Sequence, residues 1–129
     1  AGHRLGTREI EESLSSHSAV AECAVVGVAD QLKGQVAMAF VVLKEPALVE
    51  TQQGRLKLEG DLMGTVDRQL GAVARPSRVH FVTVLPKTRS GKVLRRSIQA
   101  LCEGRDPGDL TTIEDPLALE QVRGALAPT

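Results

Sequence analysis

A lysine that follows a Ser-Gly pair is the side chain in this sequence best suited to chemistry. Lys92 comes directly after Ser90 and Gly91, in the run Leu-Pro-Lys-Thr-Arg-Ser-Gly-Lys-Val. Ser and Gly allow tight turns and let a ligand approach the backbone closely. A lysine at that place is a long, positively charged side chain that can bind a phosphate. Val93 stands where a nucleotide-binding P-loop has Ser or Thr, so the run is not a P-loop.

Two other interpretations of the same run have to be weighed. Taken alone, Ser-Gly-Lys fits a solvated lysine at the start of a helix equally well. The cations around it also fit a nucleic-acid-binding module, because ten residues hold Lys87, Arg89, Lys92, Arg95 and Arg96. A formal net charge of zero, two Phe, and the lack of Trp and Tyr to stack on bases argue against that module. A stand-alone interaction domain is a third alternative.

The run Pro-Lys-Thr-Arg-Ser-Gly-Lys at 86–92 resembles the last signature of the adenylate-forming acyl-CoA synthetases. A second signature of that family opens the chain, with Gly-His-Arg-Leu-Gly-Thr at 2–7 and Glu-Ile-Glu at 9–11. Two signatures in the family's order and at its spacing are far more specific than a lone Ser-Gly-Lys. The resemblance implies a ligase that joins a carboxylate to CoA through an acyl-adenylate, at the expense of ATP taken with Mg²⁺.

The end of the chain narrows the resemblance to the short-chain branch of the family. Gly-Asp-Leu-Thr-Thr at 108–112 and Asp-Pro at 115–116 are similar to the tail of acetyl- and propionyl-CoA synthetases. Within that branch, Gly-Ala-Val-Ala at 71–74 and Cys-Glu-Gly-Arg-Asp-Pro-Gly-Asp at 102–109 most resemble the enzymes that act on propionate. The resemblance therefore implies propionate as the substrate, with acetate as the alternative. The chain begins at Ala1 without Met, inside the first signature. We therefore expect 1–129 to be the C-terminal domain of a longer enzyme, with 103–129 as its tail, and to be inactive alone.

The resemblance also implies roles for single residues. Lys92 is the expected catalytic residue, which contacts the reacting carboxylate and phosphate during adenylate formation. Arg4 matches an arginine that contacts ATP phosphates, and an exposed arginine without a role is the alternative. Gly2 matches a glycine that leaves room for the pantetheine arm of CoA, and an ordinary turn glycine is the alternative. Ala1 replaces a serine that often touches CoA, which puts that contact in doubt.

Two further sites follow from the resemblance, each with a plainer alternative. In relatives, an arginine that binds the CoA 3′-phosphate stands at the position that Asp67 occupies here. The neighbouring Arg68 is a candidate to bind that phosphate instead, and the alternative is a solvated charge on a helix. Ser15, His17 and Val20 match a cation site that some relatives build partly from backbone carbonyls. No partner at a metal-ligand spacing accompanies His17, so a surface or packing histidine is the alternative.

The partners implied are the enzyme's own N-terminal adenylation domain and, for Lys92, a lysine acetyltransferase and a deacylase, because acylation of this lysine is common in the family. We expect neither a nucleic acid nor a membrane as a partner. No apolar run approaches the roughly 18 residues of a membrane span. The two cysteines, Cys23 and Cys102, form no Cys-x-x-Cys motif and do not suggest a disulfide scaffold. A reducing compartment is therefore the default expectation. We expect a cytoplasmic protein, or a mitochondrial matrix protein in a eukaryote.

The elements that must position these residues are predicted from the apolar pattern. Two almost continuous apolar runs, at 20–29 and 36–43, indicate strands buried on both faces, and the short polar turn between them predicts antiparallel pairing. A third strand is predicted at 79–85. One helix is expected to begin after Thr7 as its N-cap, and a second is expected to run from Leu56 to the Ala-Arg-Pro at 74–76. Two more helices are expected at about 92–102 and at 116–123, and a loop at 44–54. The predicted fold is α+β, a small three-stranded sheet with flanking helices.

Overall fold

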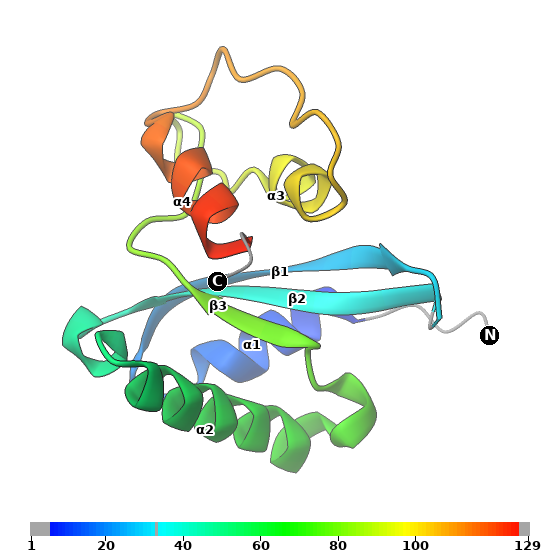
Figure 1. The fold of residues 1–129 in the computed structure, drawn as a ribbon, viewed down its shortest axis with the longest axis vertical. Coiled ribbons are helices and arrows are strands. Elements are labelled where there is room, and N and C mark those ends of the chain that lie inside the picture. The colour runs from blue at the N-terminus through cyan, green and yellow to red at the C-terminus, as the bar shows by residue number, and fades with distance from the viewer. Residues whose placement is uncertain (1–5, 33, 127–129) are drawn as a thin grey trace.

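The computed structural model describes residues 6–32 and 34–126, and it has the predicted α+β fold. A three-stranded sheet forms the centre, and α-helices pack on both of its faces (Figure 1). The first three candidate site residues of the chain, Ala1, Gly2 and Arg4, lie outside the described residues.

The sheet has the order β1-β2-β3. Strands β1 (Val20–Asp30) and β2 (Gly34–Leu43) form the predicted antiparallel hairpin, and β3 (Arg78–Phe81) lies parallel to β2. The third strand is shorter than predicted, because Phe81 already pairs with Val41 and β2 ends two residues later. The chain beyond Phe81 soon has no strand to pair with and leaves the sheet.

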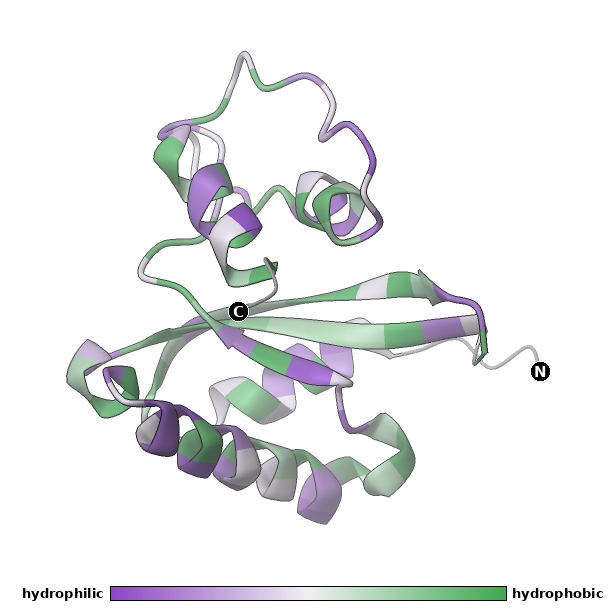
Figure 2. Ribbon diagram, viewed as in Figure 1, coloured by the Kyte–Doolittle hydropathy of each residue, from purple (hydrophilic) through white to green (hydrophobic). Residues whose placement is uncertain are grey.

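Each face of the sheet is covered by a pair of helices. Helices α1 (Thr7–Ser15) and α2 (Gln52–Leu70) cover one face, and α3 (Arg95–Cys102) and α4 (Leu117–Leu126) cover the other (Figure 1). Side chains alternate along β1, so Cys23 and Val25 face the first pair while Ala24 and Val26 face the second. Burial on both sides explains why β1 and β2 are apolar at most positions (Figure 2).

The starts of two helices differ from the prediction. Helix α1 has Gly6 as its N-cap, and Thr7 is the first helical residue instead of the cap; the Gly6 carbonyl accepts the Ile10 N–H at 3.0 Å. Helix α2 begins at Gln52, within the segment predicted as a loop. The Thr51 hydroxyl caps it by accepting the Gly54 N–H at 3.0 Å. Its first turn faces solvent, so it carries no apolar repeat that would reveal the helix.

The end of helix α2 and the bounds of helix α4 also differ from the prediction. Helix α2 stops at Leu70, because Gly71 adopts a φ of +95° that ends the helix, and residues 72–74 form a short 3-10 turn before Pro76. Helix α4 is shifted to Leu117–Leu126 from the predicted 116–123. The Asp115 carboxylate accepts the Leu117 N–H at 3.0 Å and marks the start of that helix.

Neither cysteine is paired in the structure. Cys23 is buried in the core as predicted, and Cys102 is half-buried at the end of α3. Burial raises the pKa of both thiols, that of Cys102 to about 11. Among the helices of residues 6–32 and 34–126, none has the length and apolar character needed to cross a bilayer.

The raised pKa of Cys102 predicts slow thiol chemistry. Only the thiolate reacts with Ellman's reagent, and at pH 8 a pKa near 11 leaves roughly one thiol in a thousand ionised. We expect both cysteines of the folded chain to be labelled far more slowly than those of the chain unfolded in urea. Labelling of the folded chain at the unfolded rate would contradict the burial described here.

Candidate active-site loop

Lys92 lies on a closed turn of the chain, residues 86–94, which we call the lysine hairpin. Lys87 and Val93 form an antiparallel bridge, in which Thr88 N–H donates to the Lys92 carbonyl and Leu94 N–H donates to the Pro86 carbonyl, each at 2.9 Å. The predicted start of a helix at about residue 92 is therefore wrong. Residues 92 to 94 are held in the hairpin, and α3 begins at Arg95.

The tip of the lysine hairpin requires a glycine. Gly91 has a φ of +93°, in the left-handed region that other residues rarely adopt, and its N–H donates to the Thr88 carbonyl at 2.9 Å. The Thr88 hydroxyl contacts the Ser90 hydroxyl at 2.9 Å and accepts the Lys92 N–H at 3.1 Å. Thr, Ser and Gly of the motif thus build the turn that presents Lys92.

The Lys92 side chain projects from this turn into solvent. The residue is exposed, and within the described part of the chain no hydrogen bond or ion pair involves its ammonium group. Two neighbouring cations are engaged instead. Lys87 pairs with Glu22 at 2.7 Å, and Arg95 pairs with Glu11 at 2.6 Å. The arrangement leaves Lys92 available for an anionic ligand.

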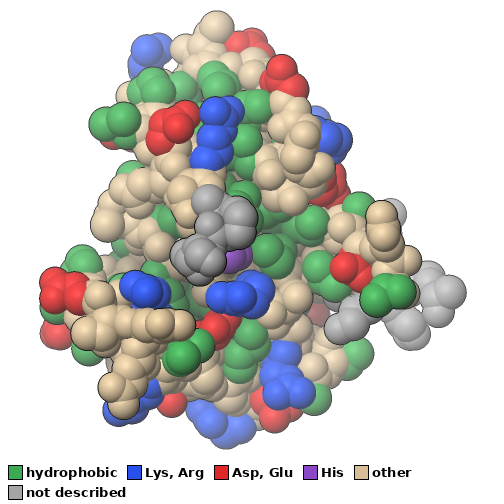
Figure 3. All heavy atoms as spheres, viewed as in Figure 1, with side chains coloured by type: hydrophobic (Ala, Val, Ile, Leu, Met, Phe, Trp, Pro, Cys, Tyr) green, Lys and Arg blue, Asp and Glu red, His purple; other side chains and the backbone are tan. Residues whose placement is uncertain are grey.

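Pairing of Lys87 and Arg95 also weakens the interpretation of this run as a nucleic-acid-binding surface. On the face seen in Figure 3, Lys and Arg side chains are interspersed with Asp and Glu. A surface that binds the phosphate backbone of a nucleic acid would instead have unpaired cations gathered on one face or along one helix.

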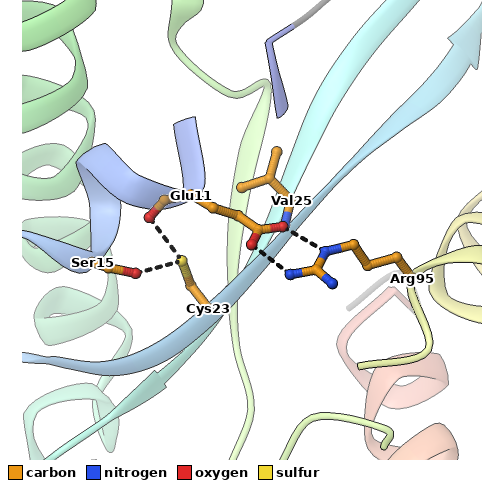
Figure 4. Close-up of polar contacts among 5 residues, drawn as sticks. All are labelled: Glu11, Ser15, Cys23, Val25 and Arg95. Atoms are coloured by element: carbon orange, nitrogen blue, oxygen red, sulfur yellow. Dashed lines mark hydrogen bonds and ion pairs between the residues drawn. The ribbon is translucent and has the colours of Figure 1, made fainter. Parts of the chain in front are cut away.

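The Glu11 carboxylate connects the three elements α1, β1 and α3 (Figure 4). One oxygen accepts the backbone N–H of Val25, on the outer strand β1, at 2.9 Å. The Arg95 guanidinium donates to both oxygens, at 2.8 Å from Nε and 2.6 Å from Nη2. This hydrogen bonding raises the pKa of Arg95. The contact joins α1 and β1 to the first residue of α3, directly after the lysine hairpin.

Of the other candidate residues that the structure describes, Arg68 lies away from the lysine hairpin. Arg68 and Asp67 are exposed on α2, which covers the face of the sheet opposite α3, and Arg68 Nη2 donates to the Thr65 hydroxyl at 3.4 Å. A role for Arg68 in binding CoA stays a prediction.

The candidate cation site at the end of α1 has neighbours of its own. Nδ1 of His17 accepts the Ala19 N–H at 3.1 Å, the His17 carbonyl accepts the Val20 N–H at 3.1 Å, and the Ser15 hydroxyl contacts Cys23 Sγ at 3.3 Å. Among the described residues, no three His, Cys, Asp or Glu side chains form a metal-binding group. A cation here would depend on backbone carbonyls, and the site stays a prediction.

Sequence reasoning missed the residues that support the lysine. Glu11 was noted only within the second signature, at 9–11, and Glu22 only as part of the strand predicted at 20–29. A charged residue inside an apolar strand is the one signal that pointed to Glu22. His80, given no role from the sequence, stacks on Phe40 with ring centroids 5.1 Å apart, and burial lowers its pKa.

Comparison of the sequence and the fold with known proteins identifies the family of this chain. Residues 9–92 match the family described as AMP-binding enzyme C-terminal domain. Propionate–CoA ligase of Escherichia coli is 64% identical over 126 residues, which cover 98% of this chain and 20% of that ligase. Acetyl-coenzyme A synthetase of Pyrobaculum aerophilum is 49% identical over 97% of this chain and 18% of its own length.

A solved structure shares the fold as well. The crystal structure of an acyl-CoA synthetase from Brucella canis matches with a TM-score of 0.62 and 41% identity, over 71% of this chain and 16% of that chain. This chain spans about a fifth of the length of the curated relatives it matches.

The Glu11 contacts predict a stability effect. Glu11→Ala removes the acceptor of the buried Val25 N–H, and losing a charged hydrogen bond of this kind costs about 1–3 kcal/mol. The ion pair contributes less, because Arg95 is half-exposed. Glu12→Ala, an exposed neighbour on the same helix, is the control and should change stability by less than about 0.5 kcal/mol. Urea unfolding followed by circular dichroism measures both, and equal stabilities would show that the Glu11 contact contributes nothing.

Proposed function

The chain belongs to the family of AMP-binding enzyme C-terminal domains, and from this premise we propose that it is the C-terminal domain of a longer AMP-forming acyl-CoA synthetase acting on propionate. The observation that carries the proposal is Lys92, which is exposed at the end of a hydrogen-bonded turn and has no ion-pair partner among the described residues. Acetate is the alternative substrate, and the order of identities, 64% to a propionate–CoA ligase and 49% to an acetyl-CoA synthetase, favours propionate.

The proposed reaction has two halves. In the first, a carboxylate oxygen of propionate attacks the α-phosphate of ATP, taken with Mg²⁺, and pyrophosphate leaves. In the second, the thiol of CoA attacks the carbonyl carbon of the propionyl-adenylate; propionyl-CoA forms and AMP leaves. Two anions must approach each other in the first half. A preorganised cation stabilises the negative charge that builds up there, and it also orients the two reactants.

Lys92 is our candidate for that cation. Its side chain is long and exposed, and no carboxylate of the described residues neutralises it. The paired cations Lys87 and Arg95 serve a different purpose, because they fix the two ends of the lysine hairpin to β1 and α1.

The residues that we propose to contact CoA and ATP lie outside the lysine hairpin in the sequence. We propose that Arg4 contacts ATP phosphates, that Gly2 leaves room for pantetheine next to Ala1, and that Arg68 is available for the CoA phosphate. Arg68 and Lys92 lie on opposite sides of the sheet, which supports a domain that presents one face for adenylation and another for thioester formation.

Exposure of Lys92 also supports a regulatory proposal. A lysine acetyltransferase has access to its ammonium group, and acylation would remove the charge that adenylation requires. A deacylase would restore it.

The role of Lys92 predicts a split between the two half-reactions. In the full-length enzyme, Lys92→Ala should lower adenylate formation by about 10²-fold or more, because one preorganised charge contact is lost. Thioester formation from supplied propionyl-adenylate should be retained. Lys44→Ala, an exposed lysine after β2, is the control and should leave both halves unchanged. Pyrophosphate release and propionyl-CoA formation measure the two halves, and equal losses would assign Lys92 a structural role.

The two-domain proposal predicts the behaviour of this chain alone. Residues 1–129 should fold, as judged by circular dichroism, yet release no pyrophosphate from ATP and propionate above a no-protein background. The physical reason is that this chain supplies Lys92 while the substrates bind to the other domain. Turnover by the isolated chain would contradict the proposal.

A further inference from the structure

The tail of the chain, residues 103–126, packs directly against the lysine hairpin. The match to the family ends at Lys92, so the tail lies beyond the region that defines the family. In the structure, Ile113 forms an antiparallel bridge with Thr88. Arg89 N–H donates to the Thr112 carbonyl at 3.1 Å, and Glu114 N–H donates to the Lys87 carbonyl at 2.9 Å.

These bonds turn the lysine hairpin into a miniature three-stranded sheet. Residues 86–89 form the central segment, with 92–94 on one side and 112–114 on the other. A two-stranded hairpin alone is marginally stable in water, and a third strand adds the support it lacks. The tail segment therefore fixes the strand against which Lys92 is held.

The tail is itself anchored at several points. The Ile113 side chain is only 6% exposed, and Val122 of α4 is fully buried in the core beneath α3. The Ser97 hydroxyl of α3 donates to the Pro107 carbonyl at 2.9 Å, and the Thr83 N–H donates to the Gln121 side chain at 2.7 Å. A segment fixed this way can resist displacement of the lysine hairpin.

We propose that residues 112–114 are a positioning element for Lys92 in the adenylation half-reaction. The inference rests on the proposed function. The tail contacts no substrate in this account; it acts through the backbone of residues 87–89, which in turn holds the Lys92 carbonyl through Thr88. A cation speeds a reaction only if it is held close to the geometry of the transition state. Loosening the tail strand should therefore impair adenylation and leave thioester formation intact.

The bond from Glu114 to Lys87 offers a selective test in the full-length enzyme. Glu114→Pro removes the donor N–H, whereas Glu114→Ala keeps it and removes only an exposed side chain. Proline also favours an extended residue before it, which suits Ile113 in its bridge. We expect Glu114→Pro to lower the kcat of pyrophosphate release by roughly tenfold, the scale of one lost hydrogen bond, with the KM for ATP unchanged. Glu114→Ala should match the unmodified enzyme.

Four further measurements separate positioning from plain destabilisation. Propionyl-CoA formation from supplied propionyl-adenylate should be retained in Glu114→Pro. In a Lys92→Ala background, Glu114→Pro should cause no additional loss of adenylation, because the residue it positions is gone. Ile113→Ala, which weakens the same strand without adding proline, should reproduce the selective loss. Hydrogen exchange at the Arg89 amide should become faster in both tail variants.

The results that would overturn the inference are specific. Full adenylation in Glu114→Pro and Ile113→Ala, with faster exchange at Arg89, would show that the tail strand does not position Lys92. Equal losses in both half-reactions would show that the tail only stabilises the domain. If the unmodified enzyme formed no acyl-adenylate, the proposed function itself would be wrong, and the inference with it.

Discussion

A sheet edge leaves backbone N–H groups that need acceptors, and in this domain carboxylates held by arginines supply them. Glu11 accepts the Val25 N–H, Glu103 accepts the Ala29 N–H and Glu59 accepts the Val79 N–H. Each carboxylate is about 15% exposed and is paired with an arginine, in turn Arg95, Arg105 and Arg78. Charged groups at an edge also prevent another strand from pairing there. The sheet can therefore stay three strands wide, and one of these pairs, Glu11–Arg95, additionally fixes the start of α3.

The lysine hairpin depends on the same edge. At its entry, Lys87 pairs with Glu22 of β1, close to the irregularity in the β1–β2 register between Val20 and Glu22. At its exit, Arg95 pairs with Glu11. The two ion pairs are partly exposed and contribute little stability each. Their effect is positional, because one end of a short turn is tied to β1 and the other to α1, while the lysine between them has no ion-pair partner in residues 6–32 and 34–126.

The sequence predicted the features that side chains encode. Strands β1 and β2 were predicted because burial on both faces demands apolar residues at nearly every position, and the turn before Lys92 was predicted from Ser90 and Gly91. The catalytic role of Lys92 came from the family resemblance and stays a prediction. The first turn of α2 was missed because it is polar and solvent-facing. The bridge between Thr88 and Ile113 was missed for a deeper reason: it is made by backbone groups far apart in the chain, and every residue type except proline supplies both the N–H and the carbonyl. The roles of Gly2 and Arg4 stay predictions, since both lie outside the described residues.

A rigid hairpin that carries a flexible side chain suits a lysine that acts in only one half of a reaction. Both sides of residues 86–89 are hydrogen-bonded, so the backbone of the turn has little freedom to lose when a substrate arrives. The lysine side chain alone must be ordered, at an entropic cost of up to about 2 kcal/mol. A loose loop would add roughly 1–2 kcal/mol for each backbone residue that had to be fixed. In the role proposed for Lys92, holding the turn in place before binding would leave more of its interaction with the developing charge available to lower the barrier.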